Sequence, residues 1–447
     1  MGWALVALAA FSFSAVSWLA WDGRLGFMAI GALLTAAGFY FAGRRKIDSK
    51  VRGKVDMTAK VLFTIVGCMA LLRHPIEIEG GDKAPIVEAI ALYIDQVDST
   101  TFITFALIAM AVKFVGVISS AYAWHLLLKG QGIRYPFWSK IMTAFLIGRF
   151  IGTFLPSTLG LDGYTLYEAG KYSNQWARAV TAKALEKFIG VTGLFLGMVV
   201  TLPFGYQVIV DVMTNAGKPE SAPLLAGAIA TVAGGVSLVV VAGLVRPGLI
   251  QWIMGVVENL TGVVSGIGPL AKIRDKILGL LGQFTAAVGA YRGKLGLLLT
   301  ALAAKFVTHF TTAAVYYFTA LAIGVTTAEF WPITFGSTIQ ILATLLSPTI
   351  AGEGAREAFQ ALLLSEQLGG VAQAVLSGAL GFIAAEAATL WGGMFLWTRR
   401  AGWRPGFAEV DGVQVDYAWI DDADDSGFDA EKIAAERAKA VQDASGS

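Results

Sequence analysis

The sequence predicts an all-α polytopic membrane protein with about eight transmembrane helices plus two inverted re-entrant helical hairpins. Of the 447 residues, 56% are hydrophobic and only 15% are charged, which is typical of a membrane protein. Apolar runs of about 20 residues recur, and a helix of that length crosses about 30 Å of hydrocarbon. Two of these runs are broken by a proline and then by polar residues, a pattern that indicates helices lining a cavity at membrane depth.

The N-terminal region, residues 1–100, contains three expected spans. The loop between the second and third spans is rich in Lys and Arg. Short basic loops lie on the cytoplasmic side, so we expect the N-terminus there too. The first run lacks a preceding basic segment, which favours a span over a cleaved signal peptide. We place the spans at about residues 3–20, 25–41 and 57–72, followed by an acidic external loop with an amphipathic helix around residues 85–97.

Residues 101–400 form the second expected region. Between two of its spans, residues 246–294 mix Lys and Arg with apolar residues, which predicts amphipathic helices on the cytoplasmic membrane surface. The last region, residues 401–447, is acidic, and we expect a largely flexible cytoplasmic tail. The spans of the second region are expected at about residues 101–128, after Lys187 to about 202, and at 222–245, 295–323 and 371–397.

The two broken helices lie at residues 145–190 and 345–388. Each shows the same order of features, namely an apolar segment, a proline break, a glycine, an acidic polar helix and an AxAV motif. This shared order predicts an internal repeat. The charges that flank the two segments indicate that the first hairpin enters from the cytoplasmic side and the second from outside. Inverted repeats with broken helices are typical of transporters that work by alternating access.

Charged residues inside predicted spans are the first candidates for a binding site. Lys113 and Glu386 each lie in the middle of a span, and Lys305 and His309 lie four residues apart on one helix face. A charge at the bilayer centre costs at least about 2.5 kcal/mol, so such residues usually face a cavity. We expect Lys113, Lys305 and His309 to hold an anionic headgroup, such as a lipid phosphate. The alternative is that they pair with Glu386 or with backbone carbonyls and only stabilise the fold.

Further candidates lie at the tips and mouths of the two hairpins. A helix N-terminus that follows a break offers free N–H groups and the positive end of the helix dipole, which suit a phosphate. The alternative is that the acidic residues only cap these helices and that the basic residues only flank the membrane. The candidates are Asp162, Glu353, Arg356 and Glu357 at the tips, and Arg149 and Lys187 at the cytoplasmic mouth.

Residues 154–162 (FLPSTLGLD) resemble the first motif of the lysylphosphatidylglycerol synthase transmembrane family, which is flippase-like. Residues 184–190 resemble the segment after it, and residues 348–357 (PTIAGEGARE) resemble the second motif. The resemblance spans about residues 102–397. It implies the transport of aminoacylated phosphatidylglycerol or of polyprenyl-linked sugars, and it makes a homodimer plausible.

The sequence departs from the family pattern at two positions. Thr165 and Lys187 stand where the family usually has Arg, and Lys offers a point charge instead of a bidentate clamp for phosphate. We therefore expect a different substrate. The segment after Arg400 is too short for the aminoacyl-transferase domain of the synthases, so lipid aminoacylation is not expected.

We expect a flippase that moves an anionic phospholipid or a polyprenyl-linked lipid across a bacterial or archaeal cytoplasmic membrane, with both termini inside. We expect neither a cofactor nor a metal site, because Cys68 is the single cysteine and the GxSxG, HExxH and P-loop motifs are absent.

Two other hypotheses remain. An integral-membrane glycosyltransferase or lipid-modifying enzyme would use a polyprenyl phosphate and a carboxylate pair, either Asp162 with Glu168 or Glu353 with Glu357. Alternatively, the protein is a scaffold whose acidic tail contacts a soluble cytoplasmic protein.

Overall fold

The described part of the chain is almost entirely helical, which confirms the predicted fold class. The first two predicted spans and most of the third lie outside the described residues, as do Pro156 and Pro348. The computed structural model describes residues 64, 67–69, 71–78, 82–154, 159–246, 248–261, 268–346, 352–398 and 408–415.

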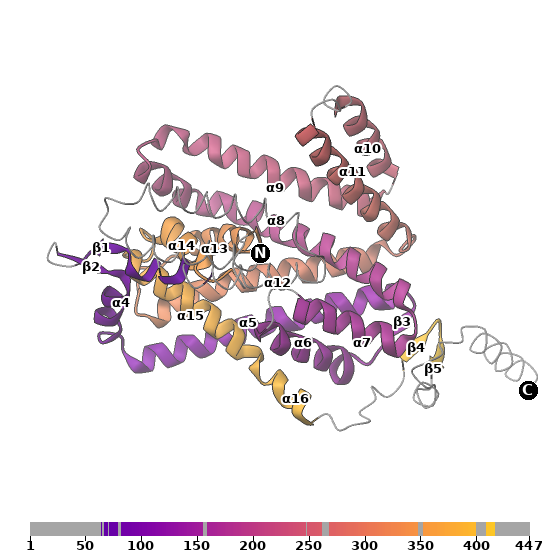
Figure 1. The fold of residues 1–447 in the computed structure, drawn as a ribbon, viewed down its shortest axis with the longest axis horizontal. Coiled ribbons are helices and arrows are strands. Elements are labelled where there is room, and N and C mark those ends of the chain that lie inside the picture. Colours follow the sequence, from indigo (N-terminus) through magenta and orange to yellow (C-terminus); the bar gives the residue numbers. More distant parts are fainter. Residues whose placement is uncertain are drawn as a thin grey trace, which may run out of the picture.

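Five helical segments within the described residues are long and apolar enough to cross a membrane. Most of them run roughly along the long axis of the molecule, and the last in sequence crosses it obliquely (Figure 1). All five match the later predicted spans. One of them extends beyond its predicted end near residue 202, through Pro203, which is tolerated because membrane helices accept proline. The segments are α5 (Ser99–Gly130), α8 (Trp176–Asn215), α9 (Ala222–Val245), α12 (Leu295–Ala322), and α15 (Val371–Leu390) continued by α16 (Gly392–Thr398).

The first broken helix is folded back on itself as a helical hairpin. Its halves touch along glycines, because a Cβ atom on Gly160 would lie only 2.3 Å from the Cα of Gly152. One turn earlier, Gly148 faces the backbone of Leu161. The elements are η2 (Phe137–Met142), α6 (Thr143–Phe154), η3 (Leu159–Gly163) and α7 (Tyr164–Ser173).

The second broken helix forms a similar hairpin from α13 (Phe330–Leu346) and α14 (Ala355–Leu364). A Cβ atom on Gly336 would lie 2.5 Å from a methyl carbon of Leu364. Figure 1 shows α6 and α7 toward one end of the molecule, and α13 and α14 toward the other.

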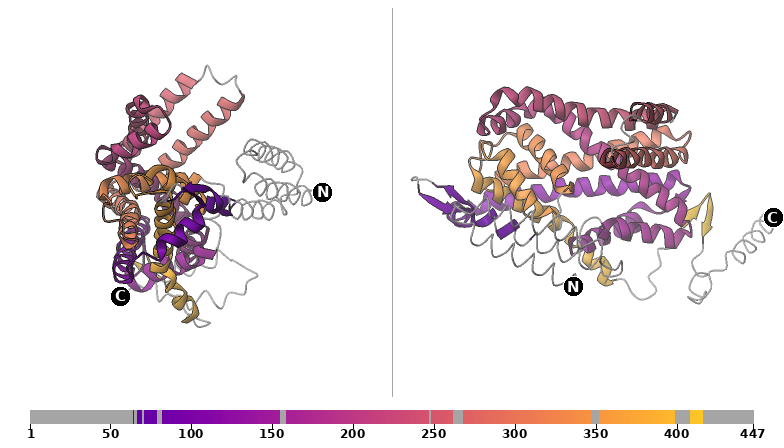
Figure 2. Two further views of the ribbon diagram at one scale, coloured as in Figure 1. Left: turned by 90° about the vertical axis from the view of Figure 1, so that its left-hand side faces the viewer. Right: turned by 45° about the horizontal axis from the view of Figure 1, so that its top comes forward.

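The predicted amphipathic region is a pair of helices, α10 (Gly248–Thr261) and α11 (Gly268–Gly289). Figure 2 shows this pair at one corner, beside the end of α9. Whether the pair lies on a membrane surface stays a prediction.

Short strands mark the two ends of the molecule. Near one end lie an antiparallel hairpin of β1 (Pro75–Glu77) with β2 (Lys83–Pro85) and the helix α4 (Ile86–Ile94), which matches the amphipathic helix predicted there. At the other end, β3 (Ile133–Arg134) pairs with β4 (Ala408–Val410).

The described part of the tail, residues 408–415, forms a β-hairpin. Strand β4 continues into β5 (Val413–Val415). Two ion pairs hold this hairpin, because Arg178 donates to Asp411 at 2.7 Å and Arg134 donates to Glu409 at 3.1 Å. The sequence analysis missed it, since short strands in a polar segment carry little signal.

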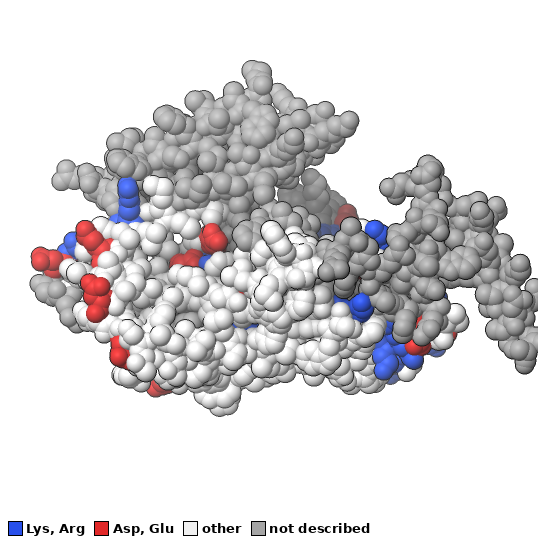
Figure 3. Space-filling model, turned by 90° about the horizontal axis from the view of Figure 1, so that it is seen from below, with Lys and Arg blue, Asp and Glu red and all other residues white. Residues whose placement is uncertain are grey.

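Figure 3 shows that the two ends differ in charge. On the face drawn, acidic side chains gather near β1, β2 and α4, and basic side chains gather at the end that holds β3 and β4. Described surface between the two ends carries few charges. A wide uncharged band between charged ends is what a bilayer requires.

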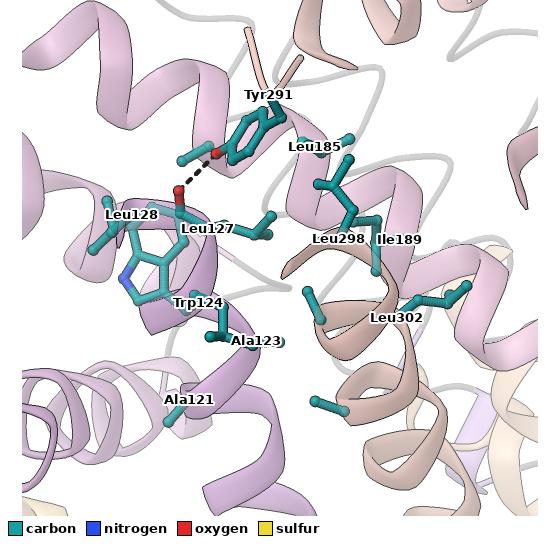
Figure 4. Packing of buried hydrophobic residues seen from close by; sticks show 14 of the residues in the cluster. Ala121, Ala123, Trp124, Leu127, Leu128, Leu185, Ile189, Tyr291, Leu298 and Leu302 are labelled. Carbon is teal, nitrogen blue, oxygen red and sulfur yellow. Dashed lines mark hydrogen bonds between the residues drawn. The ribbon is translucent and has the colours of Figure 1, made fainter. Parts of the chain in front are cut away.

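The core lies where α5, α8 and α12 meet. Figure 4 shows Leu127 of α5 pointing toward Leu185 of α8 and Leu298 of α12, while Trp124 packs on the other side of α5. At one edge of this core, the hydroxyl of Tyr291 donates a hydrogen bond to the carbonyl of Leu127 at 2.7 Å. These three helices also carry Lys113, Lys183, Glu186 and Lys305, four buried charged residues.

Candidate functional site

Polar side chains form one continuous face on α12. Lys305, His309, Thr312, Tyr316 and Thr319 are separated by four, three, four and three residues, so they lie on the same side of the helix. The face extends about 21 Å along the helix axis. We call these five residues the polar face of α12. Two clusters of charged groups from other elements contact this face, and a third cluster lies on α14 of the second hairpin.

The first cluster is centred on Glu186 of α8. Its Oε1 accepts a hydrogen bond from Lys305 Nζ at 2.6 Å, and its Oε2 accepts one from Lys183 Nζ at 2.6 Å. All three side chains are buried, with exposed fractions of 7–9%. Lys305 also donates to Ser120 Oγ at 2.7 Å. Two buried lysines therefore share one carboxylate.

Close packing of two backbones places Glu186 beside Lys305. A Cβ atom on Gly193 would lie 2.8 Å from the carbonyl carbon of Lys305, so α8 and α12 touch at this point. Glu186 precedes Gly193 by seven residues, or about two turns, and lies on the same face of α8.

Lys183 connects this cluster to the first hairpin. Its ammonium group donates to Thr165 Oγ1 at 2.9 Å and lies 3.6 Å from Asp162 Oδ1. It also sits 3.9 Å from the ring centroid of Trp124, in a cation–π contact. Lys187 forms an ion pair with the other oxygen of Asp162. The tip of the first hairpin is thus tied to α8.

The second cluster is centred on Glu386 of α15. Arg149 of α6 donates to Glu386 at 3.1 Å, and Thr153 of α6 donates to its second oxygen. Lys113 of α5 is 8% exposed and donates to Thr312 of the polar face at 3.0 Å. Among the described residues, no carboxylate oxygen lies within 4.0 Å of its ammonium group. Lys113 is therefore a buried cation with a hydroxyl as its partner.

The third cluster belongs to α14 of the second hairpin. Glu357 accepts hydrogen bonds from the backbone N–H of Gly354 at 2.8 Å and from Arg356 at 2.6 and 2.9 Å. The guanidinium of Arg356 lies 4.0 Å from the ring centroid of Phe382. Glu357 thus caps its own helix, whereas Glu353 lies just before that helix and is partly exposed.

The structure brings only some of the predicted site residues together. Lys305 and Lys113 both lie between α5 and α12 and reach the same polar face, on which His309 is partly buried. Glu386 binds Arg149 and not Lys305. Their roles in binding a substrate stay predictions.

Glu186 is the residue that sequence reasoning did not select. Its spacing of three from Lys183 places both side chains on one face of α8 and is the one signal in the sequence that points to it. Its pairing with Lys305 depends on the contact between α8 and α12, which the sequence does not reveal.

Comparison with known proteins agrees with the motifs. A family model described as the lysylphosphatidylglycerol synthase TM region matches residues 84–395. No curated protein and no solved structure gave a match.

Proposed function

The chain belongs to the lysylphosphatidylglycerol synthase TM-region family, and from this premise we propose that it moves a lipid with an anionic headgroup across a membrane. One observation carries the proposal. Lys113 is buried and hydrogen-bonded to Thr312, with no carboxylate within ion-pair distance in the described part of the chain. A buried cation without an anionic partner destabilises the fold unless an anion binds beside it.

The charges around the polar face support this proposal. In the first cluster, Lys183, Lys187 and Lys305 form ion pairs with Asp162 and Glu186. In the second cluster, Lys113 and Arg149 accompany a single carboxylate. Among these named residues of the described chain, each cluster therefore holds one more positive than negative group when all are ionised. A phosphate near either cluster removes that excess, which fits an anionic phospholipid or a polyprenyl phosphate.

The arrangement of the hairpins supports a route across the bilayer. We assign the end that holds β3 and β4 to the cytoplasm because basic residues gather there. The two hairpins then enter from opposite sides as re-entrant segments, and the polar face of α12 connects them. Movement of the hairpins about this face gives alternating access to the two leaflets.

The main experiment follows a headgroup-charged lipid in proteoliposomes. Lys113→Met removes the charge and keeps the length of the side chain. We expect it to slow the crossing of fluorescent phosphatidylglycerol at least tenfold, because one charge-assisted hydrogen bond contributes about 1.5–3 kcal/mol. Lys218→Met, at an exposed lysine, is the matched control and leaves the rate unchanged.

Equal rates in wild type, Lys113→Met and protein-free vesicles contradict the proposal. The lipid is also recovered and analysed by mass spectrometry. A covalently altered lipid would instead favour the enzyme hypothesis. The structure gives that hypothesis little support, since Asp162 and Glu357 are both engaged in ion pairs.

A further inference from the structure

Four buried polar atoms near the second hairpin lack hydrogen-bond partners. They are Oε1 and Nε2 of Gln360, Oε1 of Gln340 and Oγ of Ser337, none of which has a partner among the described residues. All three side chains are fully buried, with exposed fractions of 0%. Buried amides are nearly always hydrogen-bonded, and leaving one unpaired costs about 1–3 kcal/mol. These groups therefore indicate a missing partner.

The groups lie close together, as two contacts show. Gly336 of α13 packs against Leu364 of α14, and Thr344 of α13 packs against Gly352, which precedes α14. The two helices therefore run antiparallel, and Gln340 and Gln360, each one turn inward from the first contact, face each other. Ser337 precedes Gln340 by three residues and lies on the same face of α13.

Neighbouring contacts connect the two glutamines to the polar face of α12. Nε2 of Gln340 donates to the hydroxyl of Tyr316 at 3.4 Å. On α15, Gly378 lies against Gln360 and Gly381 lies against the ring of Tyr316. The two glycines are one turn apart, so Tyr316, Gln340 and Gln360 converge on the same stretch of α15.

We propose that Gln340, Gln360 and Ser337 form a subsite for the hydroxyl groups of a polyol headgroup. The inference rests on the proposed lipid transport and specifies the class of its substrate. Each hydroxyl has one O–H donor and lone pairs that accept, so two hydroxyls of one headgroup donate to the amide oxygens of Gln340 and Gln360 and also accept from Nε2 of Gln360. A metal cation binds only the oxygens and leaves that Nε2 unpaired.

The spacing along α12 fits a lipid that contacts both places. Thr312, which binds Lys113, precedes Tyr316 by four residues, or about 6 Å along the axis. That separation suits a phosphate at Lys113 and a three-carbon polyol that reaches the glutamines. A headgroup without hydroxyls leaves the amides unpaired.

Flanking glycines give α14 the means to open this buried subsite. Gly352 and Gly354 precede the helix with φ of 74° and 77°, and Gly369 and Gly370 follow it with φ of 78° and 149°. Such backbone angles favour glycine, and a few residues at the ends of an element commonly act as its hinges. Rotation of α14 about these pairs would expose Gln360.

The test compares two lipids of equal charge in proteoliposomes. Phosphatidylglycerol carries headgroup hydroxyls and phosphatidylmethanol carries none, and both bear the same fluorescent acyl chain. We expect wild type to move phosphatidylglycerol about tenfold faster, the effect of one or two hydrogen bonds. In Gln360→Leu and Gln340→Leu the ratio of the two rates falls to about one. The control Gln96→Leu, at an exposed glutamine, keeps the wild-type ratio.

The ratio is measured within each variant, so a smaller amount of folded protein does not change it. A wild-type ratio near one, or a ratio that both Leu variants keep, overturns the subsite and leaves the amides binding only water. A wild-type protein that moves neither lipid contradicts the proposed function itself.

Discussion

Replacing Glu186 by Gln tests the shared carboxylate of the first cluster. The variant keeps the size of the side chain but leaves Lys183 and Lys305 without their common negative partner, which each now approaches at 2.6 Å. Breaking a buried ion pair by removing one partner costs about 3–5 kcal/mol. Lys183 keeps a second carboxylate, Asp162, at 3.6 Å, so we expect a loss of about 3 kcal/mol, at the lower end of that range.

The free energy of unfolding is measured by chemical denaturation in detergent micelles. The double variant Glu186→Leu with Lys305→Leu removes both members of one ion pair and leaves Lys183 beside Asp162. We expect it to regain most of the loss, because apolar side chains replace buried ion pairs with little cost. Glu220→Gln, at an exposed carboxylate, serves as the control. A loss below about 1 kcal/mol for Glu186→Gln, or a double variant no more stable than the single one, refutes the reasoning.

Two further predictions concern the hairpin and the tail. Gly160→Ala should destabilise the protein by about 1–3 kcal/mol, because its Cβ would lie 2.3 Å from the Cα of Gly152, whereas Gly163→Ala meets nothing within 4 Å and should be tolerated. Thermal unfolding of both variants checks this. Asp411→Asn removes an exposed ion pair with Arg178 and should cost less than about 1 kcal/mol, while exchange of the β4 and β5 amide hydrogens becomes faster.

The spans could be predicted from sequence because each is a local property. A run of apolar residues must form a helix in lipid, where every backbone group needs an internal partner. The predicted ends of the spans at residues 222–245 and 295–323 therefore lie within about one residue of the observed ends of α9 and α12. The broken helices were recognisable for the same reason, since proline and glycine interrupt such runs.

The partners of the buried charges could not be predicted, because each pairing joins helices that are distant in sequence. Lys305 binds Glu186 because Gly193 allows α8 and α12 to touch. Similarly, Glu386 binds Arg149, which lies 237 residues away. Hydropathy shows that a charge is buried, but only tertiary packing decides which group neutralises it.

The two hairpins are held in different ways, and this difference leads to a last prediction. Asp162 of the first hairpin binds Lys183 and Lys187 on α8, so its charge fixes the hairpin to a neighbouring span. Glu357 of the second hairpin binds Arg356 and the backbone of Gly354, both within its own segment.

Asp162→Asn should therefore speed hydrogen exchange across η3 and α7 relative to α8, because the hairpin loses its attachment. Glu357→Gln should speed exchange only at the start of α14, where a helix cap typically contributes about 1 kcal/mol. Hydrogen–deuterium exchange with mass spectrometry measures both effects in one experiment. Faster exchange throughout α13 and α14 in Glu357→Gln would contradict this distinction, since it would show that the carboxylate also holds the second hairpin in place.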